Sequence, residues 1–170
     1  MIAPDTRPTR RNGFTLIEVL IALLVLSIGL LGIGKIMMLS ARANDSALMR
    51  SQATALAWTI LDAMRANRQA ALSVGYDTAL GVVPAPVVCT AAAPCSSGQQ
   101  AQNDLALWGA SLAAGLPAGK GSVATAVSAD TATGANNVTA TVKVQWTDTV
   151  AQQAFGGAGN NVTIVLETVL

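Results

Sequence analysis

The sequence has no histidine, two cysteines and few charged residues. Only 11% of its 170 residues are charged, against about 25% in typical globular domains. Without histidine, Ser-His-Asp and Cys-His nucleophile systems are excluded, and two cysteines alone are too few for the usual zinc sites. A net charge of +1 offers no basic surface for phosphate backbones, so we expect no nucleic-acid partner. We therefore expect a protein that is not an enzyme and that uses no metal or cofactor.

The remaining carboxylates do not suggest acid/base chemistry. They are scattered along the C-terminal part without a neighbouring acid or a metal-ligand pattern. We expect each of them to be a helix cap or a surface charge: Asp77, Asp104, Asp130, Asp148 and Glu167.

The apolar residues are concentrated near the N-terminus. Between Arg11 and Lys35 the one ionisable side chain is Glu18. A helix that crosses a hydrocarbon core of about 30 Å needs roughly 20 residues, so this segment predicts a span through the lipid bilayer. A cleaved signal peptide with a cut near Ala41 or Ala43 is less favoured, because the apolar run is too long for a signal core.

The orientation of this span is not decided by charge. Three basic residues precede it and three follow within about 20 residues, namely Arg7, Arg10 and Arg11, then Lys35, Arg42 and Arg50. Cys89 and Cys95 can close a short disulfide loop in an oxidising compartment, which favours a C-terminal part outside the cytoplasm. The alternative is two unpaired thiols.

Glu18 needs an explanation, because a carboxylate near the bilayer centre costs roughly 2.5 to 3.5 kcal/mol. Either it lies near the headgroups and reaches water, or a cation lies at the same depth. The two alternatives make different predictions for its replacement by leucine.

The residues around Glu18 carry a family resemblance. Residues 10–20 read RRNGFTLIEVL, which resembles the type III signal of type IV prepilins and pseudopilins. The resemblance implies that prepilin peptidase cuts after Gly13 and methylates the new amino group of Phe14. It further implies that Thr15 and Glu18 serve assembly, with Glu18 neutralising the N-terminal amine of a subunit in the filament.

Later segments resemble the minor pilins called PilV, the type IV pilus modification proteins. These segments are residues 28–32 (IGLLG), 50–53 (RSQA) and 64–68 (MRANR). This resemblance implies a minor pilin that helps to initiate or cap the pilus, with other minor pilins, the major pilin and the inner-membrane assembly platform as partners. It also implies a single-pass inner-membrane protein with a cytoplasmic N-terminus, which later reaches the periplasm and pilus fibre. A type II secretion pseudopilin and a bitopic membrane-anchored binding protein are the alternatives.

The helical part is predicted to be long. No proline lies between Pro8 and Pro84, so one helix can run from residue 14 to about residue 72. Three glycines, Gly29, Gly32 and Gly34, predict either local melting or close helix packing. Beyond Lys35 apolar residues recur at helical spacing, at Leu39, Ala43, Ala47, Ala53, Leu56, Ala57, Ile60, Leu61 and Met64.

The C-terminal part predicts a β-rich head. A short helix capped by Asn103 and Asp104 is expected to end by Gly115, and strands are expected from Val123, over 138–147 and over 161–169. A hairpin through 130–137 and a loose connection over 148–160 join the strands. The resulting fold is α+β and type IV pilin-like, in which the resemblance supplies the packing of the long N-terminal helix on a small antiparallel sheet. The segments are a cytoplasmic leader (1–13), a transmembrane and assembly helix (14–36), an amphipathic helix (37–74) and a periplasmic or pilus-exposed head (75–170).

Overall fold

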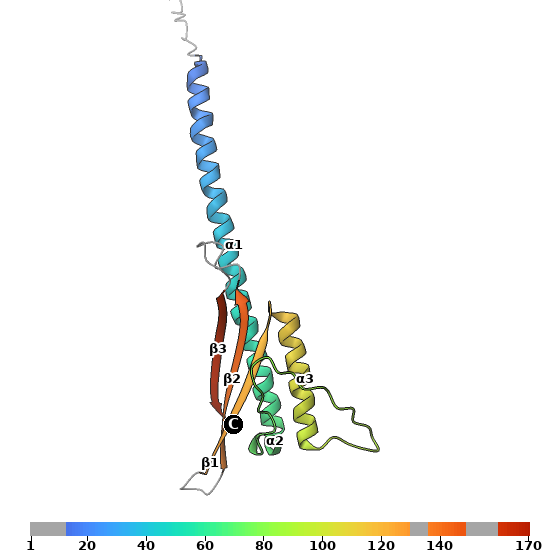
Figure 1. Ribbon diagram of the computed structural model, residues 1–170. Helices are drawn as coiled ribbons and strands as arrows, with labels where there is room; N and C mark the ends of the chain where they lie inside the picture. The colour runs from blue at the N-terminus through green and yellow to red at the C-terminus, as the bar shows by residue number, and fades with distance from the viewer. Residues whose placement is uncertain (1–12, 130–135, 149–159) are drawn as a thin grey trace, which may run out of the picture. The chain divides into compact units, whose positions relative to one another are not determined.

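The computed structural model describes residues 13–129, 136–148 and 160–170, and the chain divides into two units at Ala41 and Arg42. A long N-terminal helix is followed by a small three-stranded antiparallel sheet, which is the predicted α+β, type IV pilin-like arrangement (Figure 1). In chain order the elements are α1 (Leu16–Ala66), α2 (Arg68–Leu72), α3 (Ser97–Gly115), β1 (Lys120–Ala129), β2 (Asn136–Asp148) and β3 (Asn160–Val169).

The first unit contains the apolar part of α1, and its side chains from residue 13 to residue 41 are all exposed. Within the described residues, α1 is the one helix that is long and apolar enough to cross a membrane. It stays helical through Gly29, Gly32 and Gly34, so the predicted local melting is not seen. A Cβ atom at any of these glycines meets nothing within 4 Å. Their close packing against another helix therefore stays a prediction.

The predicted single helix to residue 72 is wrong in its last turns. α1 ends at Ala66, and Asn67 leaves the helical region with φ −118° and ψ 56° before α2 begins. The Asn67 side chain donates a hydrogen bond to the Ser97 carbonyl oxygen at 2.8 Å. This contact with the start of α3 accompanies a change of direction that buries Ala70 and Ala71 of α2.

The sheet has the order β1-β2-β3, with both neighbouring pairs antiparallel. The alternation predicted for 138–147 is confirmed, because the predicted inward residues of β2 are all buried: Val138, Ala140, Val142, Val144 and Trp146. The third strand is also confirmed, within one residue of its predicted start. Most of the predicted hairpin over 130–137, with Asp130, and of the predicted connection over 148–160 lies outside the described residues. The ends of both are strand instead, because β2 includes residues 136, 137 and 148 and β3 begins at residue 160.

The core of the second unit joins this sheet face to the C-terminal part of α1 and to α3. The predicted stripe on α1 is buried only from Ala53 onward. Leu39, Ala43 and Ala47 are exposed, because packing on α1 begins at the half-buried Met49. Trp108 of α3 is buried and donates from its Nε1 to the Leu56 carbonyl oxygen of α1 at 2.9 Å.

The helix predicted after Asn103 and Asp104 begins earlier, at Ser97. Ser96 and Gln99 form a capping box, in which the Gln99 amide donates to Ser96 Oγ at 3.3 Å and the Ser96 amide donates to Gln99 Oε1 at 2.9 Å. These bonds satisfy amide groups that a helix start otherwise leaves free. The predicted end at Gly115 is confirmed.

Candidate functional site

The bond between Gly13 and Phe14 lies just before α1. Both residues are exposed and outside the helix, and the Phe14 side chain is 83% accessible. A peptide bond outside regular structure carries no helical hydrogen bonds that a protease must first break. The predicted cleavage position is therefore accessible in the chain.

Thr15 directly precedes the first residue of α1 and caps the helix. Its Oγ1 accepts a hydrogen bond from the Glu18 amide at 3.3 Å, and its carbonyl oxygen accepts from the Glu18 and Val19 amides at 3.1 and 3.3 Å. This is N-cap geometry, with Glu18 three residues into the helix, where its negative charge favours the positive end of the helix dipole. The Thr-x-x-Glu spacing of a capping box, at residues 15 and 18, is the local signal for this role.

Glu18 is exposed on α1, on the same side of the helix as Phe14. The two residues line one shallow groove along the helix together with apolar side chains, namely Val19, Ala22, Leu23 and Leu26. Among the described residues no cation forms an ion pair with Glu18. If Glu18 has a cationic partner, that cation lies outside the described part of the chain, or it is a charge that processing adds to the described residues.

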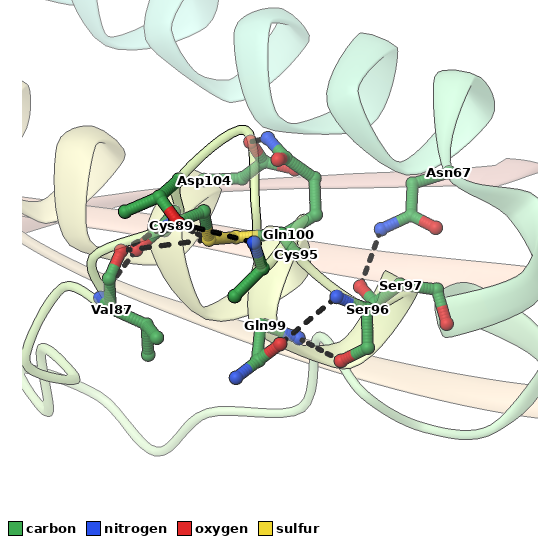
Figure 2. Close-up of a disulfide and its surroundings, with 12 residues drawn as sticks. Asn67, Val87, Cys89, Cys95, Ser96, Ser97, Gln99, Gln100 and Asp104 are labelled. Atoms are coloured by element: carbon green, nitrogen blue, oxygen red, sulfur yellow. Dashed lines mark hydrogen bonds between the residues drawn. A yellow bond between two sulfur atoms is a disulfide. The ribbon is translucent and has the colours of Figure 1, made fainter.

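Cys89 and Cys95 lie at disulfide distance, with Cα atoms 5.3 Å apart (Figure 2). Asn103 of α3 holds the segment before them, because its Oδ1 accepts from the Val87 amide at 2.6 Å and its Nδ2 donates to the Val87 carbonyl oxygen at 3.0 Å. Gln102 adds a hydrogen bond to the Ala85 carbonyl oxygen at 2.8 Å. Asn103, predicted as a helix cap, thus ties this loop to the side of α3.

Asp104, expected to be a cap or a surface charge, instead pairs with a buried phenol. Tyr76 has no exposed surface and donates from its Oη to Asp104 Oδ2 at 2.6 Å, while Gln100 donates to the other oxygen at 2.9 Å. Burial raises the pKa of Tyr76 well above its usual range, and the hydrogen bond to Asp104 raises it further. Tyr76 therefore stays protonated and holds the segment after α2 against α3.

Asp148 is likewise not the helix cap or surface charge that was expected, since it is only 2% exposed at the end of β2. Its Oδ2 accepts a hydrogen bond from Ser46 Oγ of α1 at 2.5 Å. Asp77 accepts from the amide and hydroxyl of Thr125 in β1, and Glu167 is an exposed charge as expected. Asp77, Asp104 and Asp148 thus connect elements of the second unit, which no local pattern in the sequence indicated.

The described residues contain no group of three or more His, Cys, Asp or Glu side chains that could hold a metal ion. The predicted site residues fall into two sets: Gly13, Phe14, Thr15 and Glu18 lie together at the start of α1, and the cysteines lie in the second unit. The first set offers an accessible peptide bond followed by a capped helix with one carboxylate.

Comparison with known proteins agrees with this set of residues. A family model described as the prokaryotic N-terminal methylation motif matches residues 8–34. No curated protein and no solved structure matches the chain. The match covers the N-terminal part of the chain, and it supports a type IV pilin-like or pseudopilin-like subunit.

Proposed function

We propose that this chain is a minor pilin, of the kind called PilV, that helps to initiate or cap a type IV pilus. Prepilin peptidase cuts between Gly13 and Phe14 and methylates the amino group of Phe14. The apolar part of α1 anchors the subunit in the inner membrane and then packs with other pilins. The observation that carries the proposal is the match of residues 8–34 to the N-terminal methylation motif.

The geometry at the start of α1 supports this proposal. The Gly13–Phe14 bond is exposed and non-helical, and Thr15 caps the helix directly after it. Cleavage there leaves the helix with its own cap, so a mature subunit retains a defined first turn. The apolar side chains of the first unit are all exposed, as expected for a surface that lipid or other pilins cover.

Cleavage also creates the cation that Glu18 lacks. The new amine of Phe14 lies one turn before Glu18, and the two residues share a helix face. We propose that the amine of a neighbouring subunit pairs with Glu18 in the filament. A buried ion pair is weak evidence of net stability, but it is a good device for register, because a misplaced subunit leaves both charges unpaired.

The second unit is the part that we place outside the cytoplasm, in the periplasm and then on the pilus. The disulfide distance between Cys89 and Cys95 supports this placement, since disulfides persist in oxidising compartments. We assign the other partners from the same proposal: the major pilin, other minor pilins and the inner-membrane assembly platform.

The first experiment is an intact-mass measurement on envelopes from a strain with its prepilin peptidase and from one without it. A mass that begins at methylated Phe14 only in the first strain supports the proposal. A full-length chain in both strains contradicts it and favours a bitopic binding protein. A cut near Ala43 instead indicates an ordinary signal peptide.

A type II secretion pseudopilin shares the processing and the helix. Deletion of the gene distinguishes the two machines, because loss of surface pili supports the pilus and loss of secreted enzymes supports the secretion system. The Gly13→Leu variant is a useful companion, because an unprocessed chain should reproduce the deletion phenotype in either machine.

A further inference from the structure

The two edges of the sheet differ in how far other segments of the chain cover them. The edge of β1 is partly covered, because Thr78 exchanges two backbone hydrogen bonds with Val123, at 2.9 and 3.2 Å, and the Gly81 amide donates to the Gly121 carbonyl oxygen at 3.0 Å. Among the described residues, β3 pairs with β2 alone. Among residues 13–129, 136–148 and 160–170, the edge of β1 is thus partly covered by residues 78–81, whereas no segment pairs with the outer edge of β3 (Figure 1).

The backbone groups at the open edge follow from the pairing of β2 with β3. The Leu170 amide donates to the carbonyl oxygen of Val138, which is its partner in the same register, at 2.8 Å. In an antiparallel pair such hydrogen-bonded positions alternate with positions that face away. The outward amides and carbonyls are therefore those of the odd-numbered residues: Asn161, Thr163, Val165, Glu167 and Val169.

The apolar face of the sheet is less completely buried at β3 than at β2. The inward side chains of β2 are fully buried, whereas Val162, Ile164 and Leu166 of β3 are only half-buried against the same core. If a further strand lay beside β3, it would cover the exposed parts of these three side chains. A strand is also the one element that satisfies a row of outward amides and carbonyls.

Sequence features that normally block an open edge are missing from β3. Residues 160–170 contain no proline and no lysine, and Glu167 is their one charged side chain. Exposed edges of soluble sheets are usually protected by such residues, by a bulge or by a covering segment. β3 pairs with β2 over ten consecutive positions without a bulge.

We infer that the edge of β3 receives an extended segment of a different protein of the pilus assembly, which adds a fourth strand to the sheet. The inference rests on the proposed function for the identity of the machine. The segment must place apolar side chains at every second position, beside Val162, Ile164 and Leu166. Its other side chains lie on the solvent face, next to Thr163 and Val165.

A second copy of this chain does not fit the edge. Ser46 lies at Asp148, beside the start of β3, and Arg68 lies at Leu170, so α1 and β3 run in the same direction in the second unit. Antiparallel pairing of two β3 strands puts the Arg42 ends of the two heads at opposite ends of the joined sheet. Two copies anchored in one membrane cannot adopt this without reversing one head. Parallel pairing of the same edges instead puts the two apolar faces on opposite sides.

The test uses the full-length chain in its own cells with a photo-crosslinking residue in place of Thr163. The matched control carries the same residue at Lys143, on the solvent face of the central strand β2. We expect a crosslink to another protein at position 163 that exceeds the control by about tenfold. Mapping of the crosslinked peptide should find apolar residues at alternate positions.

The deciding variants are Val165→Pro and Val165→Thr in this background. Proline removes an outward amide that β2 does not use, and edge positions of this kind tolerate it. Val165→Pro should therefore reduce the crosslink about tenfold, whereas Val165→Thr keeps the amide and should retain it. Protease resistance of the head checks folding, and Glu167→Pro, at the next outward position, replaces Val165→Pro if that variant unfolds.

The outcomes separate this inference from the proposed function. A crosslink that survives the folded proline variant, or that joins two copies of this chain, or that is no stronger than the control, overturns strand addition. The N-terminal mass measured in the same cells reports the proposed function independently. An uncut N-terminus together with a proline-sensitive crosslink retains the binding edge and rejects the pilus as its setting.

Discussion

Ile28 and Ile60 lie on the same helix, yet Ile28 is 63% exposed and Ile60 is 1% exposed. Ile28 belongs to the first unit, where apolar side chains surround the helix on every side. Ile60 belongs to the second unit, where one stripe of α1 packs into a core with α3 and the sheet. An apolar residue on α1 therefore has one of two roles. In the first unit it offers surface to lipid or to other subunits, and in the second it stabilises the chain's own head.

The largest expected effect on assembly is at Glu18, the one ionisable residue between Arg11 and Lys35. Glu18→Leu should reduce incorporation into filaments by about tenfold or more, the loss that corresponds to about 1.4 kcal/mol or more, because the partner amine loses its carboxylate. Membrane insertion should be unchanged or improved. Quantification of the subunit in sheared pili and in membranes measures both.

The matched control for Glu18→Leu is Ser27→Leu, which also replaces a polar residue of the same stretch. Ser27 satisfies its hydroxyl within the helix, at the Leu24 carbonyl oxygen, so this variant should assemble normally. Normal incorporation of Glu18→Leu would remove the argument for a paired carboxylate.

The contrast between the two units is tested directly by Ile60→Ala and Ile28→Ala. Ile60→Ala should lower the free energy of unfolding of the second unit by about 2 to 5 kcal/mol, because it leaves a cavity in the core. Ile28→Ala should leave that free energy unchanged. Tryptophan fluorescence during denaturation reports the second unit alone, since all three tryptophans, Trp58, Trp108 and Trp146, lie in it. Equal losses for the two variants would contradict the division.

A smaller effect is expected from the cysteine pair within the head. Replacement of Cys89 and Cys95 by serine should cost about 2 kcal/mol, because the ring that they close is short. Proteolysis should increase between residues 84 and 96 while the sheet stays protected. Labelling of both cysteines by a thiol reagent in the unreduced protein would show that no disulfide forms.

The smallest effect is expected at Tyr76. Tyr76→Phe should cost about 1 kcal/mol at neutral pH, because it removes the hydrogen bond to Asp104. The raised pKa of Tyr76 also predicts the direction in which stability changes with pH. Its contribution to stability is complete below the unfolded value of about 10 and declines as pH rises above it, since the unfolded chain then releases the proton first.

The alkaline part of this prediction can be followed at one residue. The chain has a single tyrosine, so the ultraviolet absorbance of tyrosinate reports Tyr76 alone. Head stability of the wild type should fall with pH above about 10, and Tyr76→Phe should flatten that fall. An unchanged slope in the variant would assign the alkaline loss to other groups.

Much of the fold was predictable because its signals are local. The apolar stretch, the alternation of β2, the strand β3 and the end of α3 all follow from residues a few positions apart. The break at Asn67 and the start of α3 at Ser97 were not predicted. The first accompanies a contact 30 residues away. The second depends on a Ser96–Gln99 capping box, which lies upstream of the predicted cap at Asn103 and Asp104.

The sequence by itself determined the membrane-type helix and the motif at Gly13, Phe14 and Glu18, since run length and spacing need no partner from elsewhere in the chain. Tertiary structure alone decided which carboxylates are structural and which sheet edge has no neighbouring strand within the described part of the chain. Tyr76 and Asp104 are 28 positions apart, and Ser46 and Asp148 are 102 apart. Folding brings such pairs together, and the local periodicity of a sequence does not indicate which distant hydroxyl a carboxylate will meet or which strands will be neighbours.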